Sequence, residues 1–312
     1  MLKYVLKRLG YILVTLWVIV TCTFFMMKNL PGTPFDAERF SIMTPQQQER
    51  VLEMYGLNDS LPMQYVKYIK NMLKGDLGTS FTYVNQDVSK VITGRLGPSA
   101  LIGIQAVLIG LAIGLILGIL AAWKHNSGID YFTMILAVLG VSVPNFVAAA
   151  LLQYYIGLKW GVLPVGFWTG WNCSVLPSIA LSFSATAMVA RFMRTEMLDV
   201  LDQDYIVTAR AKGLSQMKVL MRHAVRNSFL PVVTILGPIV VNLMTGSLAV
   251  ENIFSIPGIG SLFVDCIKAN DYPVIMGITI FYAAFYMLIV LLVDLAYSLI
   301  DPRIRLAKGK ES

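Results

Sequence analysis

Long apolar runs alternate with shorter polar segments along most of the chain. Six of them are long enough to cross a bilayer as helices, which takes roughly 20 residues at about 1.5 Å each. They cover residues 9–27, 99–123, 131–158, 176–193, 230–250 and 274–300. Backbone polar groups in lipid are satisfied only within helices or closed barrels, and runs this long favour helices. The pattern predicts an all-α polytopic membrane protein with six transmembrane helices.

The segment between the first two runs has a different, amphipathic pattern. Thr44 and Pro45 are typical of a helix start, and Gly56 of its end. A second helix is predicted after Leu61, with an apolar stripe and an end at Gly75. The predicted division is therefore residues 1–28 as the N-terminal tail and first transmembrane helix, 29–98 as a small extracytoplasmic helical domain, 99–300 as a five-helix core, and 301–312 as a tail.

The basic residues predict which side of the membrane each segment faces. If the N-terminus lies inside, most of the 25 Lys and Arg fall in inside segments, and the short outside loops hold only Lys159 and Lys268. Cytoplasmic loops carry this excess of basic residues. We therefore expect a multi-pass membrane chain with both termini in the cytoplasm.

The composition is that of a membrane protein and does not favour nucleic acid as a partner. The 312 residues are 56% hydrophobic and 14% charged, whereas soluble domains carry about 25% charged residues. The net charge of +7 is scattered between apolar runs, which favours contact with anionic lipid. Cys22, Cys173 and Cys266 have no metal-binding spacing, and a disulfide between the last two is an alternative to free thiols.

Glycines recur at close intervals in the second apolar run. Gly103, Gly110, Gly114 and Gly118 include two steps of four residues. This spacing lets helices approach closely in lipid, so a tight helix pair is predicted here.

The motifs of common enzyme sites are missing. The sequence contains no GxxxxGK[ST] phosphate loop, no GxSxG elbow and no His, Cys or acidic cluster with metal spacing. We therefore expect no catalysis, no metal and no cofactor bound by this chain.

A few polar residues within the spans are candidates for a translocation path. Pro144 interrupts the backbone ladder of the third run and is followed by Asn145, which is typical both of a cavity wall and of plain packing. Ser182 and Thr186 in the fourth run and Asn242 in the fifth complete the predicted path.

Asp294 is an ionisable residue within the sixth run. An intramembrane charge is a functional candidate, and an ion-coupled carrier would use it. Its position near the inside end favours a structural role instead.

The polar stretch 204–231 lies between two apolar runs and carries five basic residues: Arg210, Lys212, Lys218, Arg222 and Arg226. The last three form one stripe, and Met217, Leu220, Met221 and Ala224 form an apolar stripe. Two short helices are predicted, joined by a reversal at Gly213. Charge alone leaves two partners open, anionic lipid and an acidic protein groove.

These segments resemble the ABC importer permeases of the dipeptide and oligopeptide family. DYIVTARAKGLS followed by RHAVRNSFLPVV is similar to the family's EAA loop, and FFMMKNLPGTPF, ENIFSIPGIGSLF and LVDLAYSLIDPRIR are similar to its other segments, in its order. The general pattern's first two residues are replaced by Val207 and Thr208, and its proline is missing. The resemblance spans nearly the whole chain and is closest to the first permease subunit of oligopeptide importers.

The resemblance implies a multi-pass pore subunit in the cytoplasmic membrane of a bacterial cell, and this subunit works with partners. It implies a second homologous permease subunit, two ABC ATPase subunits that bind ATP and Mg²⁺, an extracytoplasmic peptide-binding protein and a peptide substrate. Within loop 194–230 it implies that the coupling helix contacting the ATPase comprises Thr208, Ala209, Arg210, Ala211, Lys212, Gly213, Leu214 and Ser215.

Three alternatives differ in substrate or class. The same family includes carriers of dipeptides and of nickel. An ion-coupled carrier would depend on Asp294 and not on an ATPase. A membrane scaffold would show no uptake phenotype.

Overall fold

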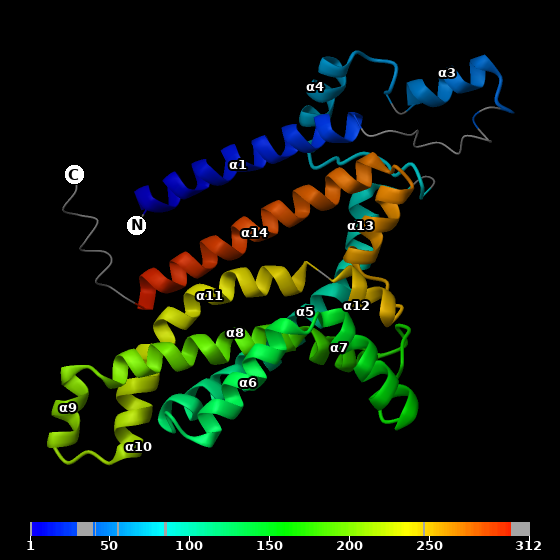
Figure 1. Ribbon diagram of the computed structural model, residues 1–312. Coiled ribbons are helices and arrows are strands. Elements are labelled where there is room, and N and C mark those ends of the chain that lie inside the picture. The colour runs from blue at the N-terminus through cyan, green and yellow to red at the C-terminus, as the bar shows by residue number, and fades with distance from the viewer. Residues whose placement is uncertain are drawn as a thin grey trace. The chain divides into compact units, whose positions relative to one another are not determined.

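The computed structural model describes residues 2–29, 40, 42–54, 56–83, 86–245 and 247–300. Its helices, in chain order (Figure 1), are α1 (Leu2–Lys28), α3 (Pro45–Met54), α4 (Leu61–Met72), α5 (Val88–Trp123), α6 (Gly128–Ser142), α7 (Asn145–Leu152), η1 (Gln153–Lys159), η2 (Trp171–Ser174), α8 (Val175–Leu201), α9 (Asp204–Ala211), α10 (Gln216–Val219), η3 (Leu220–Val225), α11 (Arg226–Met244), α12 (Leu248–Ile253), α13 (Ile259–Lys268) and α14 (Tyr272–Ile300).

Among the described residues, five helical stretches are long and apolar enough to cross a membrane. A bent pair, Gly128–Ser142 and Asn145–Lys159, raises the number to six if it counts as one span. The two helices meet at an angle of 100°. Pro144 has no N–H to donate and adopts φ −58° and ψ 138°, so helix α6 ends before it. The predicted six-span all-α fold is confirmed, and the third span is broken rather than merely kinked.

The chain divides into two compact units. Unit 1 comprises residues 1–97 and 259–285, and unit 2 comprises residues 98–258 and 286–312. Each unit has its own hydrophobic core.

In unit 1, the start of α5 packs against α13 and the start of α14, with Val88, Ile259 and Ile278 fully buried. Helix α4 lies against the end of α1, where the Thr21 and Tyr65 hydroxyl groups are 2.7 Å apart. The predicted cap is present, because Thr44 N donates to Gln47 Oε1 at 2.9 Å.

Asp271 holds a loop of unit 1 against the start of α14. Its side chain is fully buried and accepts hydrogen bonds from the Ser80 hydroxyl and from the backbone N–H groups of Phe81 and Thr82. Val274 N donates to the same carboxylate at 3.4 Å, so Asp271 also caps α14.

In unit 2, the predicted glycines of α5 form the tightest helix contacts. A Cβ at Gly114 would lie 2.7 Å from Val189 Cβ, and one at Gly118 would lie 2.6 Å from the Ala190 carbonyl oxygen. Helix α8 can approach α5 this closely only because these residues have no side chain.

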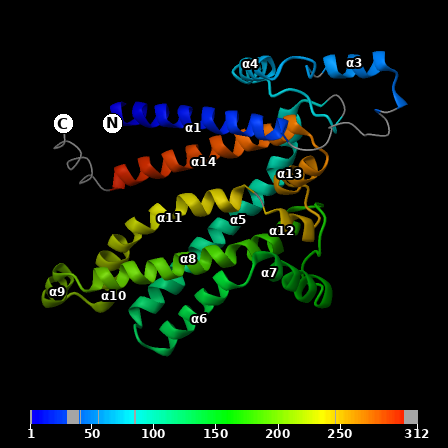
Figure 2. The same ribbon diagram turned by 45° about the horizontal axis from the view of Figure 1, so that its top comes forward.

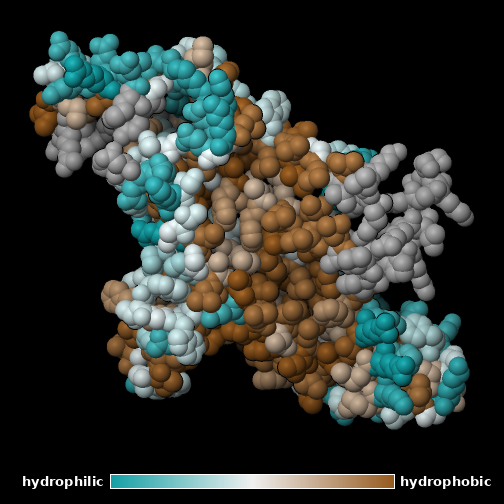
Figure 3. Space-filling view, turned by 180° about the vertical axis from the view of Figure 1, so that it is seen from behind, coloured by the Kyte–Doolittle hydropathy of each residue, from teal (hydrophilic) through white to brown (hydrophobic). Residues whose placement is uncertain are grey.

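Apolar side chains cover much of the surface, as Figure 3 shows on one face. Leu13, Leu108, Ile116, Leu139 and Leu288 are each at least half exposed. A soluble protein rarely exposes a patch of this kind, so lipid or a partner subunit is expected to cover it.

The three cysteines are free, so no disulfide pairs Cys173 with Cys266. Both residues are buried, and burial raises the pKa of the Cys266 thiol to about 12. The thiol of Cys266 is therefore protonated and unreactive at neutral pH.

Candidate functional site

The polar stretch after α8 folds into a helical reversal. Helix α9 begins at Asp204, whose carboxylate suits the positive end of the helix. Beyond it, Gly213 has φ +76° and donates its N–H to the Arg210 carbonyl at 3.0 Å. This left-handed conformation favours glycine. In Figures 1 and 2, α9 and α10 lie at the end of α8 that is opposite to α7 and α12.

A small apolar cluster holds α9 in place and leaves its other face exposed. Ile206, Ala209 and Val219 are buried together, and Leu214 packs against them. The rest of the predicted coupling set is exposed: Thr208, Arg210, Ala211, Lys212, Gly213 and Ser215. The structure thus presents two cations and a row of small residues on a surface that a partner can reach.

The second helix of the stretch differs from the prediction. It is not short, because α10 continues through the π-helical turn η3 into α11, which runs to Met244 past Pro231. The predicted apolar stripe is also wrong in part: Leu220 and Ala224 are buried, but Met217 and Met221 are about half exposed. The π turn shifts which residues face α8, and a regular helical period cannot show this.

Side-chain hydrogen bonds join this region to its neighbours. Asn227 Nδ2 donates to the Tyr205 hydroxyl at 3.0 Å and so links α11 to α9. The buried Ser228 hydroxyl donates to the Glu196 carbonyl at 3.2 Å and so links α11 to α8. A displacement of α9 would therefore be transmitted to both long helices.

A buried ion pair joins the first turn of α6 to α8. Arg194 Nε and Nη2 donate to the two oxygens of Asp130 at 2.6 and 2.8 Å, and Asp130 is only 2% exposed. The same carboxylate accepts from the Asn126 N–H at 3.0 Å and lies 3.1 Å from His125 Nδ1. Sequence reasoning missed this pair, although a lone acid at the start of an apolar run is a usable signal.

Helices α5 to α8 line a cavity of about 780 Å³ that is open to the surface on one side and has mostly apolar walls. Ser182 and Thr186 line it, together with Thr133, Val143 and Ala148. Two of the predicted path residues are thus brought together there. Pro144 and Asn145 lie in the chain between two lining residues without lining the cavity themselves.

The other predicted path residues are not part of this cavity. Asn242 is exposed on α11 and is not among the lining residues. Asp294 belongs to α14, but its side chain lies outside the described part of the structure.

The loop after α12 forms a packed turn. Glu251 is 3% exposed and accepts a hydrogen bond from the Ser99 hydroxyl at 2.7 Å. A Cβ at Gly258 would collide with the Glu251 carboxylate. Gln153 Nε2 donates to the Ile253 carbonyl at 2.7 Å, which fixes the turn to η1. These contacts pack the loop against η1 and the start of the second apolar run.

Among the described residues, no three His, Cys, Asp or Glu residues are placed to hold a metal ion.

Two family models match the chain. Residues 114–306 match the binding-protein-dependent transport system inner membrane component, and residues 1–96 match the N-terminal part of the membrane component of binding-protein-dependent transport systems.

Characterised relatives are similar over almost the full length. The chain is 46% identical to the dipeptide transport system permease protein DppB of Lactococcus lactis, covering 98% of this chain and 100% of that protein. It is 39% identical to the oligopeptide transport system permease protein OppB of Haemophilus influenzae, with the same coverage of both chains.

One solved structure shares the fold. A chain from the crystal structure of an amino acid ABC transporter aligns with a TM-score of 0.51 and 19% identity, covering 69% of this chain and 94% of that one.

Proposed function

Because the chain belongs to the family of binding-protein-dependent transport system inner membrane components, we propose that it forms the membrane path of an ATP-driven importer of oligopeptides. It is a multi-pass permease subunit of the dipeptide and oligopeptide ABC transporter family. The observation that supports an energy-coupling role is the exposed reversal at Gly213, held at the end of α8 by its own apolar cluster.

Dipeptides are the second candidate substrate. Relatives named for dipeptide transport reach 46% and 43% identity, against 39% for those named for oligopeptide transport. Uptake of a labelled tripeptide, competed by unlabelled dipeptides and by pentapeptides, separates the two. If pentapeptides inhibit uptake of the labelled tripeptide more strongly than dipeptides do, oligopeptide import is supported. If only dipeptides inhibit it, the oligopeptide proposal is overturned. Nothing in the names of these relatives favours nickel or an ion-coupled carrier.

Members of this family work with ATPase and substrate-binding partners. We assign ATP and Mg²⁺ to two ATPase subunits that dock on the exposed face of α9. A second homologous permease subunit completes the pore, and the extracytoplasmic binding protein delivers peptide. Arg210 and Lys212 are placed to meet an acidic groove on the ATPase, and charge attraction also speeds the encounter.

Peptide movement follows from a change in α9. Closure of the ATPase pair would displace α9. The bond from α9 to α11, and that from α11 to α8, would carry the displacement to the helices around the apolar cavity. A wall with few charged groups suits a peptide, because its backbone is neutral and its side chains vary. Ser182 and Thr186 supply the polar contacts in this proposal.

Gly213→Val tests this coupling role. A Cβ at Gly213 meets nothing within 4 Å, so the penalty comes from φ +76° alone. A left-handed residue costs about 1–2 kcal/mol, and more when it is β-branched. We expect peptide uptake to fall by about tenfold, since 1.4 kcal/mol corresponds to a factor of ten in the population of the docking conformation. Uptake into cells and co-purification of ATPase subunits measure the effect.

Gly213→Asn is the matched control. Asparagine tolerates a positive φ far better than valine, so this variant should retain most of the uptake. Normal uptake and normal ATPase binding in Gly213→Val would remove the coupling role from this turn.

The proposed sidedness has a direct test. With both termini in the cytoplasm, a single cysteine in place of Asp59 should react with a membrane-impermeant maleimide in intact cells. A single cysteine in place of Lys212 should react only after the membrane is opened. Lys212 is exposed, and Asp59 is partly exposed in the loop before α4. The reverse labelling pattern would invert the topology.

A further inference from the structure

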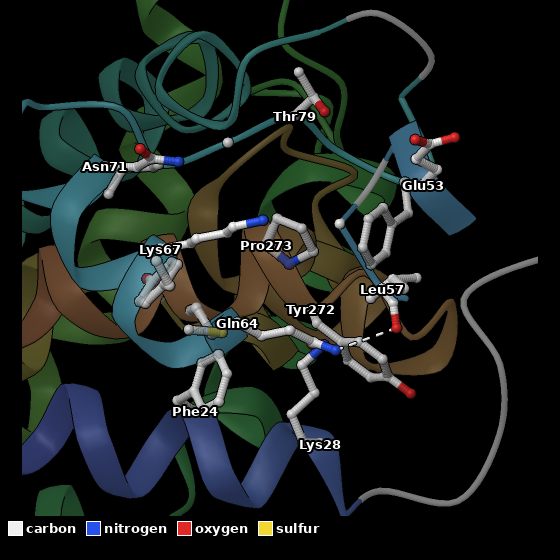
Figure 4. A pocket seen from close by; sticks show the side chains of 16 residues that line it. Phe24, Lys28, Glu53, Leu57, Gln64, Lys67, Asn71, Thr79, Tyr272 and Pro273 are labelled. Carbon is white, nitrogen blue, oxygen red and sulfur yellow. Dashed lines mark hydrogen bonds between the residues drawn. The ribbon is translucent and has the colours of Figure 1, made fainter. Parts of the chain in front are cut away.

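Unit 1 contains a cavity that the transport path does not use. It has a volume of about 360 Å³ and lies where the end of α1, helix α4, the loop at residues 77–81 and the first turn of α14 converge (Figure 4). Pockets that hold small ligands begin at about 300 Å³. The cavity is therefore large enough for a small molecule the size of a short peptide.

Its walls are aromatic and packed against one another. The ring of Phe24 lies 5.9 Å from that of Tyr68, and the ring of Phe81 lies 6.2 Å from that of Tyr272. Phe24 is only 3% exposed. Asp271 holds the loop that carries Phe81, as described above. These contacts form the cavity before any ligand arrives.

Lys28 places a positive charge in this cavity without a counter-charge. Its side chain is half-buried, and its ammonium lies 5.8 Å from the centre of the Phe24 ring. Within the described part of the chain, no carboxylate forms an ion pair with it. Glu53 also lines the cavity but points away from Lys28 in Figure 4. A partly buried charge of this kind is costly unless a ligand compensates it.

Tyr68 supplies a second donor that lacks an acceptor. Its hydroxyl oxygen is buried and has no hydrogen-bond partner among the described residues. Burial raises the pKa of Tyr68, so the phenol stays protonated and can donate. An unsatisfied buried donor costs folding free energy.

Two other polar side chains of the cavity are engaged with neighbouring residues. Lys67 Nζ lies 2.6 Å from Asp59 Oδ2. Gln64 Nε2 donates to the Leu57 and Asp59 carbonyl oxygens, and Figure 4 shows the first of these bonds. Besides the uncharged side chains of Asn71 and Thr79, the cavity wall thus offers the Lys28 ammonium and the unsatisfied Tyr68 hydroxyl, which together suit one carboxylate beside an apolar body.

We propose that this cavity binds the terminal carboxylate of a short peptide, with the Lys28 ammonium and the Tyr68 hydroxyl as its donors and the aromatic walls around the last side chain. The proposal rests on the proposed function, which places unit 1 on the side from which peptide arrives. It gives the importer a site on the permease itself that recognises a free C-terminus.

The test uses the full-length chain in nanodiscs of uncharged lipid. Binding of the dipeptide Ala-Phe and of its C-terminal amide is measured by calorimetry for the unaltered chain and for Lys28→Met, Tyr68→Phe and Lys70→Met. We expect the acid to bind and the amide to bind at least about tenfold more weakly, because the amide loses a charge-assisted hydrogen bond. Lys28→Met should bind the acid about tenfold more weakly than the unaltered chain does, and Tyr68→Phe should weaken this binding by a smaller factor. Lys70→Met is the control, because this exposed lysine of α4 does not line the cavity.

Folding is checked by thermal melting without ligand. Lys28→Met removes an uncompensated charge, so its Tm should equal or exceed that of the unaltered chain. Equal binding of acid and amide, or unchanged binding in Lys28→Met, overturns the proposal.

A lipid headgroup is the competing source of an anion. If phosphatidylglycerol nanodiscs raise the Tm of the unaltered chain but not of Lys28→Met, while Ala-Phe does not bind, the cavity belongs to lipid and the proposal fails. Peptide uptake by cells is followed in parallel. If cells with the chain take up peptides normally but the purified chain binds acid and amide equally well, only this site is rejected. If cells with the chain take up no more of any peptide than cells without it, the proposed function is rejected.

Discussion

Gly118→Leu should prevent the stable assembly of α5 with α8. The Cβ of any residue at this position would lie 2.6 Å from the Ala190 carbonyl oxygen, 2.8 Å from Met193 Cβ and 3.2 Å from Arg194 N. Two of these atoms are backbone, so no side-chain rotation relieves the contact. The helices would have to separate, and the packing that close approach permits in lipid would be lost. We expect the variant to be nearly absent from membranes, as measured by immunoblotting and by size-exclusion chromatography in detergent.

A smaller substitution, compared with the same change elsewhere in α5, separates the effect of this contact on stability from the effect of helix propensity. Gly118→Ala should lower stability by about 1–3 kcal/mol, the usual cost of overpacking. Gly94→Ala is the matched control in the same helix, because a Cβ there meets nothing within 4 Å. Alanine favours a helix over glycine by about 1 kcal/mol, so the control should gain stability or remain unchanged. A stable Gly118→Ala would contradict the tight contact.

The sequence predicted these contacts because they depend on spacing alone. Gly110, Gly114 and Gly118 recur every four residues, so they share one face of a helix whatever that face meets. Gly213 was likewise predictable, since a glycine between two helical patterns usually supplies a positive φ.

Features that depend on distant segments were not predictable in the same way. The exposure of Met217 and Met221 results from the π turn at 220–225, which a regular helical period does not show. The cavity of unit 2 is formed by four helices, and the positions of Ser182 and Thr186 on it follow from how those helices cross. The 100° break at Pro144 also depends on the packing of α7.

The ion pair between Asp130 and Arg194 was also not predictable from the sequence. The two residues are 64 positions apart, and each has an ordinary interpretation in sequence as a basic or acidic flank of an apolar run. Only the fold shows that both oxygens of one carboxylate are bonded to one guanidinium. Arg194 lies about two helical turns before the end of α8 that leads into α9, so the pair can fix the part of α8 from which the reversal at Gly213 extends.

Asp130→Ala should be the most destabilising single loss of a polar group in unit 2. It would leave Arg194, whose side chain is 20% exposed, without either of its carboxylate bonds. Removing one partner of a buried pair costs about 3–5 kcal/mol, largely because the remaining charge stays desolvated. We expect a marked fall in Tm in detergent and weaker peptide uptake, because the part of α8 that leads to the reversal at Gly213 would no longer be fixed to the first turn of α6.

A double-mutant cycle tests the cause. The cycle compares Asp130→Leu, Arg194→Met and the two together. The double variant removes both charges at once, and apolar replacement of a complete buried pair is often neutral, so it should be more stable than Asp130→Leu alone. His125→Ala is the control, because His125 also lies near the Asp130 carboxylate but is 44% exposed. An exposed ion pair contributes about 0–1 kcal/mol, so this variant should lose little stability. If the double variant is as unstable as the sum of the single changes, the pair is not coupled and Asp130 acts through its Asn126 contact instead. If stability is restored in the double variant but uptake is not, the pair fixes the coupling reversal as well as the fold, which is the outcome we expect.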